Sequence, residues 1–289
     1  MADEEKPVRT IGIVGAGSIG TGLCVDLLLH GLRVVLVDVS EEQLERARAS
    51  IPETVRLAPM LRRGLPKMSP EDVLAAIDFT SDLAAVADCE FVVENVTEEW
   101  ETKRAVYREL DEVAAPGARF GVNTSSIPIG KLAAETGRAD RIVGTHFMNP
   151  PYLKDAVEVV RAAGTSHETL DYVRELFGVL GKEAIVVDDH PGFVSNRISH
   201  LFFNEAARVV EEQGVNPATV DRLFKKCFGH PMGPLETADL IGLDTVALTL
   251  DSLHASYGDA KFACAGILRE MIASGRLGRK SGEGFYKYA

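Results

Sequence analysis

The glycine cluster GAGSIG, from Gly15 to Gly20, constrains the fold of this chain more than any other feature. The short apolar run TIGIV precedes it, and a leucine-rich stretch typical of a helix follows it and ends at Gly31. A strand, a tight turn and a helix in this order bring free backbone amides to the N-terminus of the helix, where a phosphate group binds. The sequence therefore predicts a dinucleotide site here, with a purely structural glycine turn as the alternative.

Each residue of the cluster has an expected role. Gly15 allows the tight turn, Gly17 lets a pyrophosphate approach the backbone, and Gly20 permits close packing of the helix on the strand. Ser18 and Ile19 begin the helix, so we expect their amides to face the phosphates. All five residues are therefore candidate cofactor ligands.

A carboxylate ends the second apolar run, RVVLVD, which completes a strand–helix–strand unit at Asp38. Asp38 lies 18 residues beyond Gly20, close to the separation expected for the acid that binds the adenosine ribose. Its carboxylate can accept a hydrogen bond from the 2′-hydroxyl and repels a 2′-phosphate. The sequence therefore predicts NAD rather than NADP as the cofactor, with a solvated acid at a strand end as the alternative.

The order of strand-like and helical segments predicts an α/β protein of two domains. Apolar runs alternate with helical stretches through the first half, as in a Rossmann-type doubly wound sheet. After His190-Pro191-Gly192 no strand-like run follows. We expect an NAD-binding domain over residues 1–190 and an all-α C-terminal domain over 191–289 that contributes to substrate binding and dimerisation. The expected helices of the second domain span residues 193–213, 217–228, 237–257 and 261–274.

Composition and charge restrict the partners of the chain. Its 289 residues include 31 Lys and Arg against 43 Asp and Glu, a net charge of −12, and an acidic protein repels polyanions. No run of basic residues offsets that field, so we expect neither nucleic acid nor a membrane as a partner. The start MADEEKPVRT lacks the apolar core of a signal peptide, which favours a cytoplasmic protein. The four cysteines form no CxxC pair, and we expect no metal site.

A histidine and a glutamate lie on two consecutive strand-like runs. His146 ends one run and precedes FMNPP, and Glu158 lies within AVEVV, where a carboxylate among valines needs a partner to offset its desolvation. A carboxylate paired with an imidazole fixes its tautomer and stabilises its protonated form. From the residues alone, a catalytic pair and a structural histidine are both open interpretations.

Two other polar residues have two interpretations each. Ser125, in NTSSIPI, follows an apolar strand and either caps a helix that begins near Ile129 or belongs to a site. Asn196, near the start of the first helix after the domain boundary, is either an ordinary polar residue of an early helical turn or a site residue. The residues alone leave both questions open.

Seven motifs occur in one order along nearly the whole chain: GAGSIG, FVVENVTEE, NTSSIPI, HFMNPP followed by VEVV, HPGFVSNRI, HPMGP followed by GLD, and GRKSGEGFYKY. In this order and spacing the chain resembles the short-chain-length L-3-hydroxyacyl-CoA dehydrogenases, including bacterial 3-hydroxybutyryl-CoA dehydrogenases. The resemblance implies an NAD-dependent oxidoreductase that interconverts a 3-hydroxyacyl thioester and its 3-ketoacyl partner. It also implies a homodimer.

The resemblance assigns a role to each member of the catalytic set. His146 matches the base that takes the hydroxyl proton, and Glu158 matches the acid that orients it. Ser125 and Asn196 match the residues that hold and polarise the substrate oxygen. The reaction is then expected in a cleft between the two domains, where closure excludes water.

Further matches surround the nicotinamide end of the cofactor. Glu98, Lys103 and Asn149 match residues that contact the nicotinamide ribose and amide, and Lys280 matches a C-terminal lysine that reaches the same cleft. These four are expected cofactor-binding residues on the strength of the resemblance.

Residues 51–64 depart from the family, in which this segment is a helical arm that binds CoA. Thr54 stands in place of the arm's serine and Leu61 in place of its lysine. Pro52 and Pro59 are expected to interrupt the helix, because proline removes a backbone donor and clashes with the preceding turn. The carrier of the acyl group is therefore the part of the reaction that the motifs specify least.

Several carriers fit this altered arm. Together with Thr54, the cations Arg56, Arg62 and Arg63 can bind CoA phosphates or meet the acidic helix of an acyl carrier protein. Asp155 stands where the family commonly has a lysine. Dehydrogenases of free hydroxy acids such as carnitine or gulonate are a third possibility. A different class of function, a non-catalytic NAD-binding structural protein, is the remaining alternative. The four catalytic matches argue against it, because a structural role needs none of them.

Overall fold

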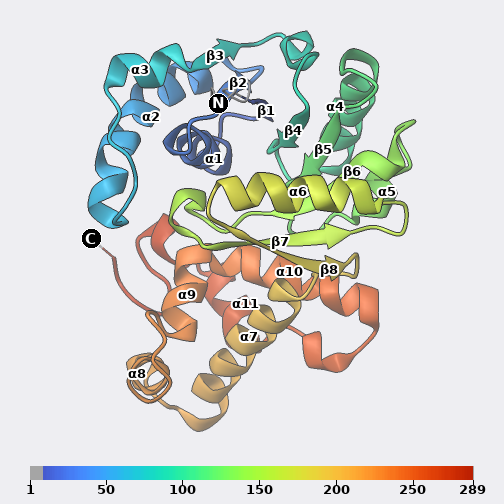
Figure 1. Cartoon of the computed structure of the whole chain (residues 1–289). Coiled ribbons are helices and arrows are strands. Elements are labelled where there is room, and N and C mark those ends of the chain that lie inside the picture. The colour runs from blue at the N-terminus through green and yellow to red at the C-terminus, as the bar shows by residue number, and fades with distance from the viewer. Residues whose placement is uncertain (1–8, 289) are drawn as a thin grey trace. The chain divides into compact units, whose positions relative to one another are not determined.

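The computed structural model describes residues 9–288. The chain divides into two compact units, with the division between Asp189 and His190. Each unit has its own arrangement of elements, an α/β unit in blue to yellow and a helical unit in orange to red (Figure 1). The predicted fold class, a Rossmann-type sheet followed by a helical part, is confirmed.

The first unit is built on one eight-stranded sheet with the strand order β3-β2-β1-β4-β5-β6-β7-β8. The first six strands are parallel, β7 runs antiparallel to β6, and β8 runs parallel to β7. The strand order reverses between β1 and β4, and in open α/β sheets ligands bind outside the carboxyl ends of the strands at such a point. The strands are β1 Thr10–Val14, β2 Arg33–Val37, β3 Ile77–Thr80, β4 Phe91–Glu94, β5 Arg119–Val122, β6 Ile142–His146, β7 Ala156–Arg161 and β8 Glu183–Asp188.

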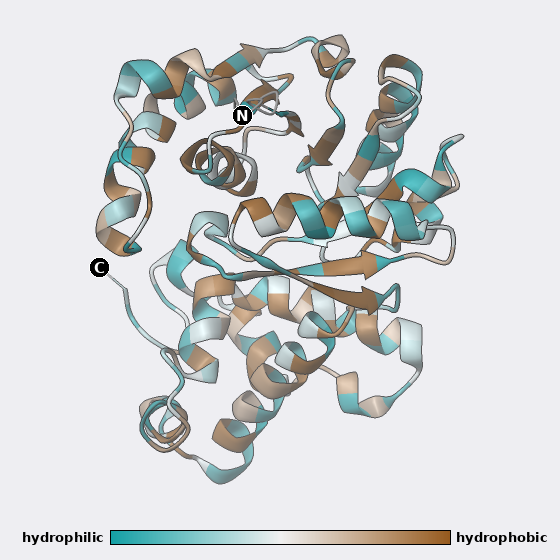
Figure 2. Cartoon of the chain, viewed as in Figure 1, coloured by the Kyte–Doolittle hydropathy of each residue, from teal (hydrophilic) through white to brown (hydrophobic). Residues whose placement is uncertain are grey.

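Helices cover the sheet and bury its apolar strands, which are mostly brown in Figure 2. One buried cluster joins α1, α2 and α6 to strand residues such as Ile13 and Val157. Elsewhere in the unit, Tyr107 of α4 packs edge-on against Phe120 of β5, with ring centroids 6.0 Å apart. The helices are α1 Ser18–Leu29, α2 Glu41–Leu61, α3 Pro70–Ala75, α4 Trp100–Val113, α5 Ile129–Ala133 and α6 His167–Val179, with short 3-10 turns η1 Leu83–Val86, η2 Ala139–Arg141 and η3 Pro151–Leu153.

The expectation that prolines interrupt the arm is wrong, because α2 runs through both Pro52 and Pro59. A proline inside a helix costs about 3 kcal/mol, whereas burial of one large aliphatic side chain contributes about 1.5–3 kcal/mol. Tertiary burial of one face of α2 therefore offsets the two missing backbone bonds. The buried stripe consists of Leu44, Ala47, Ile51, Val55 and Ala58.

The second unit packs its helices around a separate core that includes Phe203, Leu235 and Leu250. The single helix expected over residues 237–257 is wrong: Gly242, with φ +104°, separates two helices. The helix expected over 261–274 is shorter than predicted. The helices are α7 Ser195–Gln213, α8 Pro217–Cys227, α9 Pro234–Ile241, α10 Leu243–Tyr257 and α11 Gly266–Ala273, with the 3-10 turns η4 Ala260–Phe262 and η5 Arg279–Ser281. Within residues 9–288 no helix has the length and apolar character needed to cross a membrane.

Candidate active site

A cavity of about 470 Å³ opens at the carboxyl ends of β1, β2 and β4. Its volume lies within the range of ordinary ligand pockets, about 300–1,000 Å³. It is the crevice expected where the strand order reverses, between β1 and β4. The lining includes Gly15 and Gly17 of the glycine turn, Asp38 after β2, and Asn95 to Thr97 after β4.

The three glycines of the turn meet different surroundings. A Cβ on Gly15, where φ is +102°, would lie 2.6 Å from the carbonyl oxygen of Asn95, and one on Gly20 would lie 1.9 Å from that of Gly15. A Cβ on Gly17 would have no atom within 4 Å. The turn is thus closed on its protein side and open at Gly17, the side from which a pyrophosphate would approach.

The N-terminus of α1 supplies donors to this open side. Its N-cap residue, Gly17, offers no side-chain acceptor to the first amides of the helix, which include those of Ser18 and Ile19. Such amides lack partners within the helix and attract an anion together with the helix dipole. The cradle therefore fits the pyrophosphate of a dinucleotide.

Asp38 lies at the rim of the cavity, half-buried. Its Oδ2 accepts a hydrogen bond from the Ala16 amide at 2.7 Å, and its Oδ1 accepts one from the Ser40 amide at 2.9 Å. Each carboxylate oxygen keeps a further lone pair for a ribose hydroxyl. No Lys or Arg is among the residues that line the cavity, so nothing in that lining would attract a 2′-phosphate.

His146 and Glu158 are brought together by the register of β6 and β7. The antiparallel pairing sets the two residues directly opposite each other, and His146 Nδ1 lies 2.8 Å from Glu158 Oε2. Their side chains are 7% and 10% exposed, so water competes little for this contact. With the carboxylate on Nδ1, the imidazole keeps Nε2 for chemistry.

Ser125 lies on the other side of the imidazole. Its Oγ is 3.0 Å from His146 Nε2, so hydroxyl, imidazole and carboxylate form one chain of contacts. The alternative that Ser125 caps a helix is wrong, because α5 begins at Ile129 with Pro128 as N-cap and no side-chain cap.

Glu98 holds the turn that carries Ser125. Its Oε1 accepts hydrogen bonds from the hydroxyl of Thr124 at 2.6 Å and from the amides of Ser125 and Ser126 at 2.9 and 3.0 Å. Burial alone would raise the pKa of Glu98, but the Thr124 hydrogen bond and the charge of Lys103 outweigh it and lower the pKa. Glu98 therefore remains an anion that orders several donors at once.

Lys103 lies beneath these loops, and its side chain is fully buried. Its Nζ donates to Glu94 Oε1 at 2.7 Å and to the carbonyl of Asn123 at 2.9 Å, and it lies 3.7 Å from Glu98 Oε2. Burial raises the pKa of Glu94 to about 7 against the opposing charge of Lys103. Lys103 thus ties the ends of β4 and β5 together under the site.

Sequence reasoning missed Glu94, although a signal was available. FVVE ends a buried strand with a carboxylate, much as AVEVV encloses Glu158, and a carboxylate in an apolar run needs a partner. Its partner, Lys103, lies nine residues away on α4. Glu94 also accepts a hydrogen bond from the Val96 amide at 2.7 Å and so shapes the loop that lines the cavity.

The remaining predicted site residues, two for the cofactor and one for the substrate oxygen, lie on a loop and in the second unit. Asn149 Nδ2 is 3.5 Å from the Ser18 hydroxyl, so the loop after β6 reaches the start of α1. In the second unit, Asn196 is the second residue of α7. Lys280 Nζ lies 2.6 Å from the Asp244 carboxylate, which links the C-terminal segment to the start of α10.

The amino-acid sequence matches two family models that together cover most of the chain. Residues 10–190 match the NAD binding domain of 3-hydroxyacyl-CoA dehydrogenase, and residues 192–288 match its C-terminal domain. The chain belongs to the 3-hydroxyacyl-CoA dehydrogenase family. The predicted resemblance is confirmed, and so is NAD as the cofactor of the first domain.

Three relatives of this dehydrogenase match over nearly their whole length. A probable 3-hydroxybutyryl-CoA dehydrogenase of Deinococcus radiodurans is 42% identical over 277 residues, covering 96% of this chain and 99% of the relative. A 3-hydroxybutyryl-CoA dehydrogenase of Bradyrhizobium diazoefficiens is 37% identical, covering 97% and 96%. The crystal structure of (S)-3-hydroxybutyryl-CoA dehydrogenase PaaH1 from Ralstonia eutropha superimposes with a TM-score of 0.91 at 38% identity, covering 98% and 99%.

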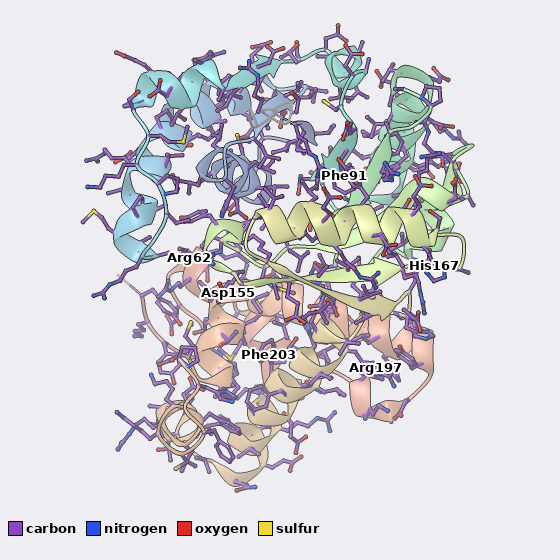
Figure 3. All side chains as sticks on the ribbon, viewed as in Figure 1. Arg62, Phe91, Asp155, His167, Arg197 and Phe203 are labelled. Carbon is purple, nitrogen blue, oxygen red and sulfur yellow. The ribbon has the colours of Figure 1, made fainter. Side chains whose placement is uncertain are left out.

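In this dehydrogenase several of the arm's predicted carrier ligands already have contacts within the protein. Thr54 Oγ1 donates to the Ser50 carbonyl at 2.9 Å, and Arg56 Nη2 lies 4.0 Å from Glu53 Oε1. Arg62 Nη2 lies 2.9 Å from Asp155 Oδ1, a pair labelled in Figure 3. Arg62 therefore joins the end of α2 to the segment before β7, and its guanidinium already has an anionic partner.

Proposed function

We propose that this protein interconverts a short-chain L-3-hydroxyacyl-CoA, such as 3-hydroxybutyryl-CoA, and the corresponding 3-ketoacyl-CoA with NAD. The observation that carries the proposal is the chain Ser125–His146–Glu158 on the same sheet edge as the nucleotide cradle. The names of the relatives, which are 3-hydroxybutyryl-CoA dehydrogenases, support the acyl chain length.

The chain's own residues supply proton transfer and orientation. His146 Nε2 takes the proton of the substrate hydroxyl, and the Glu158 carboxylate, 2.8 Å from Nδ1, stabilises the imidazolium that results. Ser125, 3.0 Å from Nε2, holds the substrate oxygen beside the base, and Asn196 is proposed to assist it. NAD, which the glycine turn and Asp38 would hold, would supply the acceptor for the hydride from C3 of the substrate.

Turnover of acetoacetyl-CoA with NADH, followed by the loss of NADH absorbance, tests the proposal. We expect His146→Ala to abolish turnover and to leave the dissociation constant of NADH nearly unchanged, because His146 is outside the lining of the nucleotide cavity. Turnover of the free hydroxy acid at a rate equal to that of the CoA thioester would contradict the assignment of substrate.

The arm favours a second candidate carrier, an acyl carrier protein. Between Arg56 and Lys67 the chain has four cations and no acid, and the side chains of Leu57, Met60 and Leu61 are 38%, 81% and 66% exposed. Arg56 and Arg62 pair with acids, but the exposed apolar side chains together with the cations Arg63 and Lys67 suit the acidic helix of a carrier protein better than they suit a small nucleotide.

Steady-state kinetics with each thioester in turn distinguish these two carriers. If the arm receives a carrier protein, Met60→Glu lowers kcat/KM for the carrier-protein thioester and leaves that for acetoacetyl-CoA unchanged. Equal kcat/KM values of the variant and the wild type for both thioesters would remove the arm from carrier recognition.

We also propose a homodimer formed through the second unit. Ile198, Leu223, Phe228 and Leu248 are 64%, 53%, 69% and 69% exposed, and large exposed apolar side chains mark interaction surfaces when they gather. Sedimentation velocity at micromolar concentration tests this assembly, and a monomer would contradict it.

A further inference from the structure

A fully buried ion pair, formed by Asp26 and Lys182, lies beside the turn that follows β6. Asp26 belongs to α1, Lys182 precedes β8, and neither side chain has exposed surface. Lys182 Nζ lies 3.0 Å from Asp26 Oδ2, and it donates hydrogen bonds to the carbonyls of Pro151, at 2.8 Å, and Lys154. An ammonium group has three donors, and three oxygen atoms surround this one.

Stability alone does not explain such a pair. Desolvation of each buried ion costs several kcal/mol, and apolar replacements of both partners are often neutral or stabilising. Burial raises the pKa of Asp26, and the charge of Lys182 opposes that rise. An apolar pair could not donate hydrogen bonds to the two backbone carbonyls that Lys182 holds.

Both carbonyls belong to the turn that carries Asn149. The turn packs tightly on α1, since a Cβ on Gly22 would lie 2.7 Å from Pro151 Cδ. Asn149 at its start lies 3.5 Å from Ser18 at the first turn of α1. The turn also forms one wall of a cavity of about 150 Å³ whose other walls are α1 and the Thr54 region of α2.

We propose that the buried Asp26–Lys182 pair positions the Asn149 turn against the N-terminus of α1 and thereby orients the nicotinamide half of NAD. Lys182 is the positioning residue, because it bonds the turn directly, and Asp26 supplies the charge that lets an ammonium remain buried. The inference rests on the proposed function and on the role predicted for Asn149 as a cofactor contact. Neither Asp26 nor Lys182 lines the nucleotide cavity, so both act through the turn.

The test replaces the pair without leaving a buried charge. Lys182→Met alone removes the cation nearest the buried Asp26 carboxylate and leaves His30 Nδ1 at 3.6 Å. It is expected to destabilise the fold, so the double variant Asp26→Leu/Lys182→Met carries the experiment. We expect it to melt within a few degrees of the wild type. Its dissociation constant for NADH rises about tenfold and kcat falls at least about tenfold, because small misplacements of reacting groups have large effects on rate. KM for the thioester changes by less than about threefold if the turn serves mainly the cofactor.

A double-mutant cycle with Asn149→Ala distinguishes positioning from general damage. In the wild-type background Asn149→Ala weakens NADH binding. In the Asp26→Leu/Lys182→Met background we expect it to weaken binding by less than about a further twofold, because the amide is already displaced there. Additive effects of the two changes would show that Lys182 does not act through Asn149.

Arg138 offers a matched control at the opposite edge of the sheet. It bonds the Asp111 carboxylate at 2.6 Å and the carbonyls of Ala115 and Asp111 at 2.7 Å each, so it combines a carboxylate and two carbonyls as Lys182 does. Arg138 lies before Ile142, the first residue of β6, and His146 is the last. The usual rise per residue separates these two ends of β6 by about 13 Å. Arg138→Met should leave NADH binding and kcat within about twofold of the wild type.

Two outcomes would overturn the inference. One is a stable Asp26→Leu/Lys182→Met variant that binds NADH and turns over like the wild type, and the other is an equal loss in Arg138→Met. The NADH binding measurement needs no acyl substrate, so its result stands even if the wild type fails to reduce acetoacetyl-CoA. Failure of the positioning role and failure of the proposed function are thus separate results.

Discussion

Replacing Glu158 with Gln tests how much the buried carboxylate contributes to proton transfer, because the change removes its charge and keeps its size. The pair is 2.8 Å apart and its side chains are 7% and 10% exposed. Coulomb's law with an effective dielectric constant of about 20 gives about 6 kcal/mol for the carboxylate with an imidazolium at this separation. The variant loses less than this Coulomb energy, because burying a neutral amide costs less desolvation energy than burying a carboxylate. The net loss expected is that of a charge-assisted hydrogen bond, about 1.5–3 kcal/mol, or about a 10- to 150-fold lower kcat.

The assay is steady-state reduction of acetoacetyl-CoA over a range of pH, with NADH binding measured separately. We expect kcat to fall while the NADH dissociation constant stays within about twofold of the wild type, because a group that acts on the imidazole does not bind the cofactor. Glu168→Gln is the control, since it removes a carboxylate that pairs with Arg119 at the surface and should leave kcat unchanged. A Glu158→Gln variant with more than half of the wild-type kcat would refute the reasoning.

Four other substitutions test the cradle and its support. Gly17→Ala should leave the melting temperature nearly unchanged, because its Cβ meets no atom within 4 Å, but it should weaken NADH binding. Gly20→Ala should prevent folding, because its Cβ would lie 1.9 Å from the Gly15 oxygen. Circular dichroism would reveal that loss of structure. Asp38→Ala should weaken NADH binding and reduce the preference for NADH over NADPH, and an unchanged ratio of dissociation constants would contradict its role. Glu94→Gln tests a pH effect: burial raises the pKa of Glu94 from 4.5 to about 7, so between these pH values the native state keeps a proton that the unfolded chain releases. The wild-type free energy of unfolding should therefore fall with rising pH relative to Glu94→Gln, by up to about 3 kcal/mol in urea denaturation; parallel curves would contradict this.

Local patterns made the nucleotide cradle predictable. The glycine turn, the strand before it and the acid at Asp38 lie within one short stretch, and each acts through its own backbone or its immediate neighbours. The pairing of His146 with Glu158 was predictable for a related reason. The two residues lie on consecutive strands joined by a short connection, and the antiparallel register then sets them opposite each other.

Features that depend on distant packing were not predictable in this way. Helix α2 continues through two prolines because its buried stripe packs against α1, α3 and the edge strand β3, and no local rule contains that burial. The break at Gly242 depends on residues 35 or more positions later, because Leu243 donates its amide to the Leu277 carbonyl and a Cβ at Gly242 would lie 3.0 Å from Lys280. Strand β3, IDFT, has no apolar run to mark it in the sequence, because it is short and only partly buried.

The carboxylates at the active edge of the sheet show why composition alone does not identify a site in an acidic protein. Glu98 accepts four hydrogen bonds from the 124–126 turn, and its pKa is lowered. Glu94, deeper in the same unit, has a pKa raised by burial even beside Lys103. Glu158 faces an imidazole, and Asp38 faces two backbone amides and the cavity. The same functional group thus orders a turn, supports two strands, orients a base or is available to a ribose, and the donors that surround each one determine which of these it does.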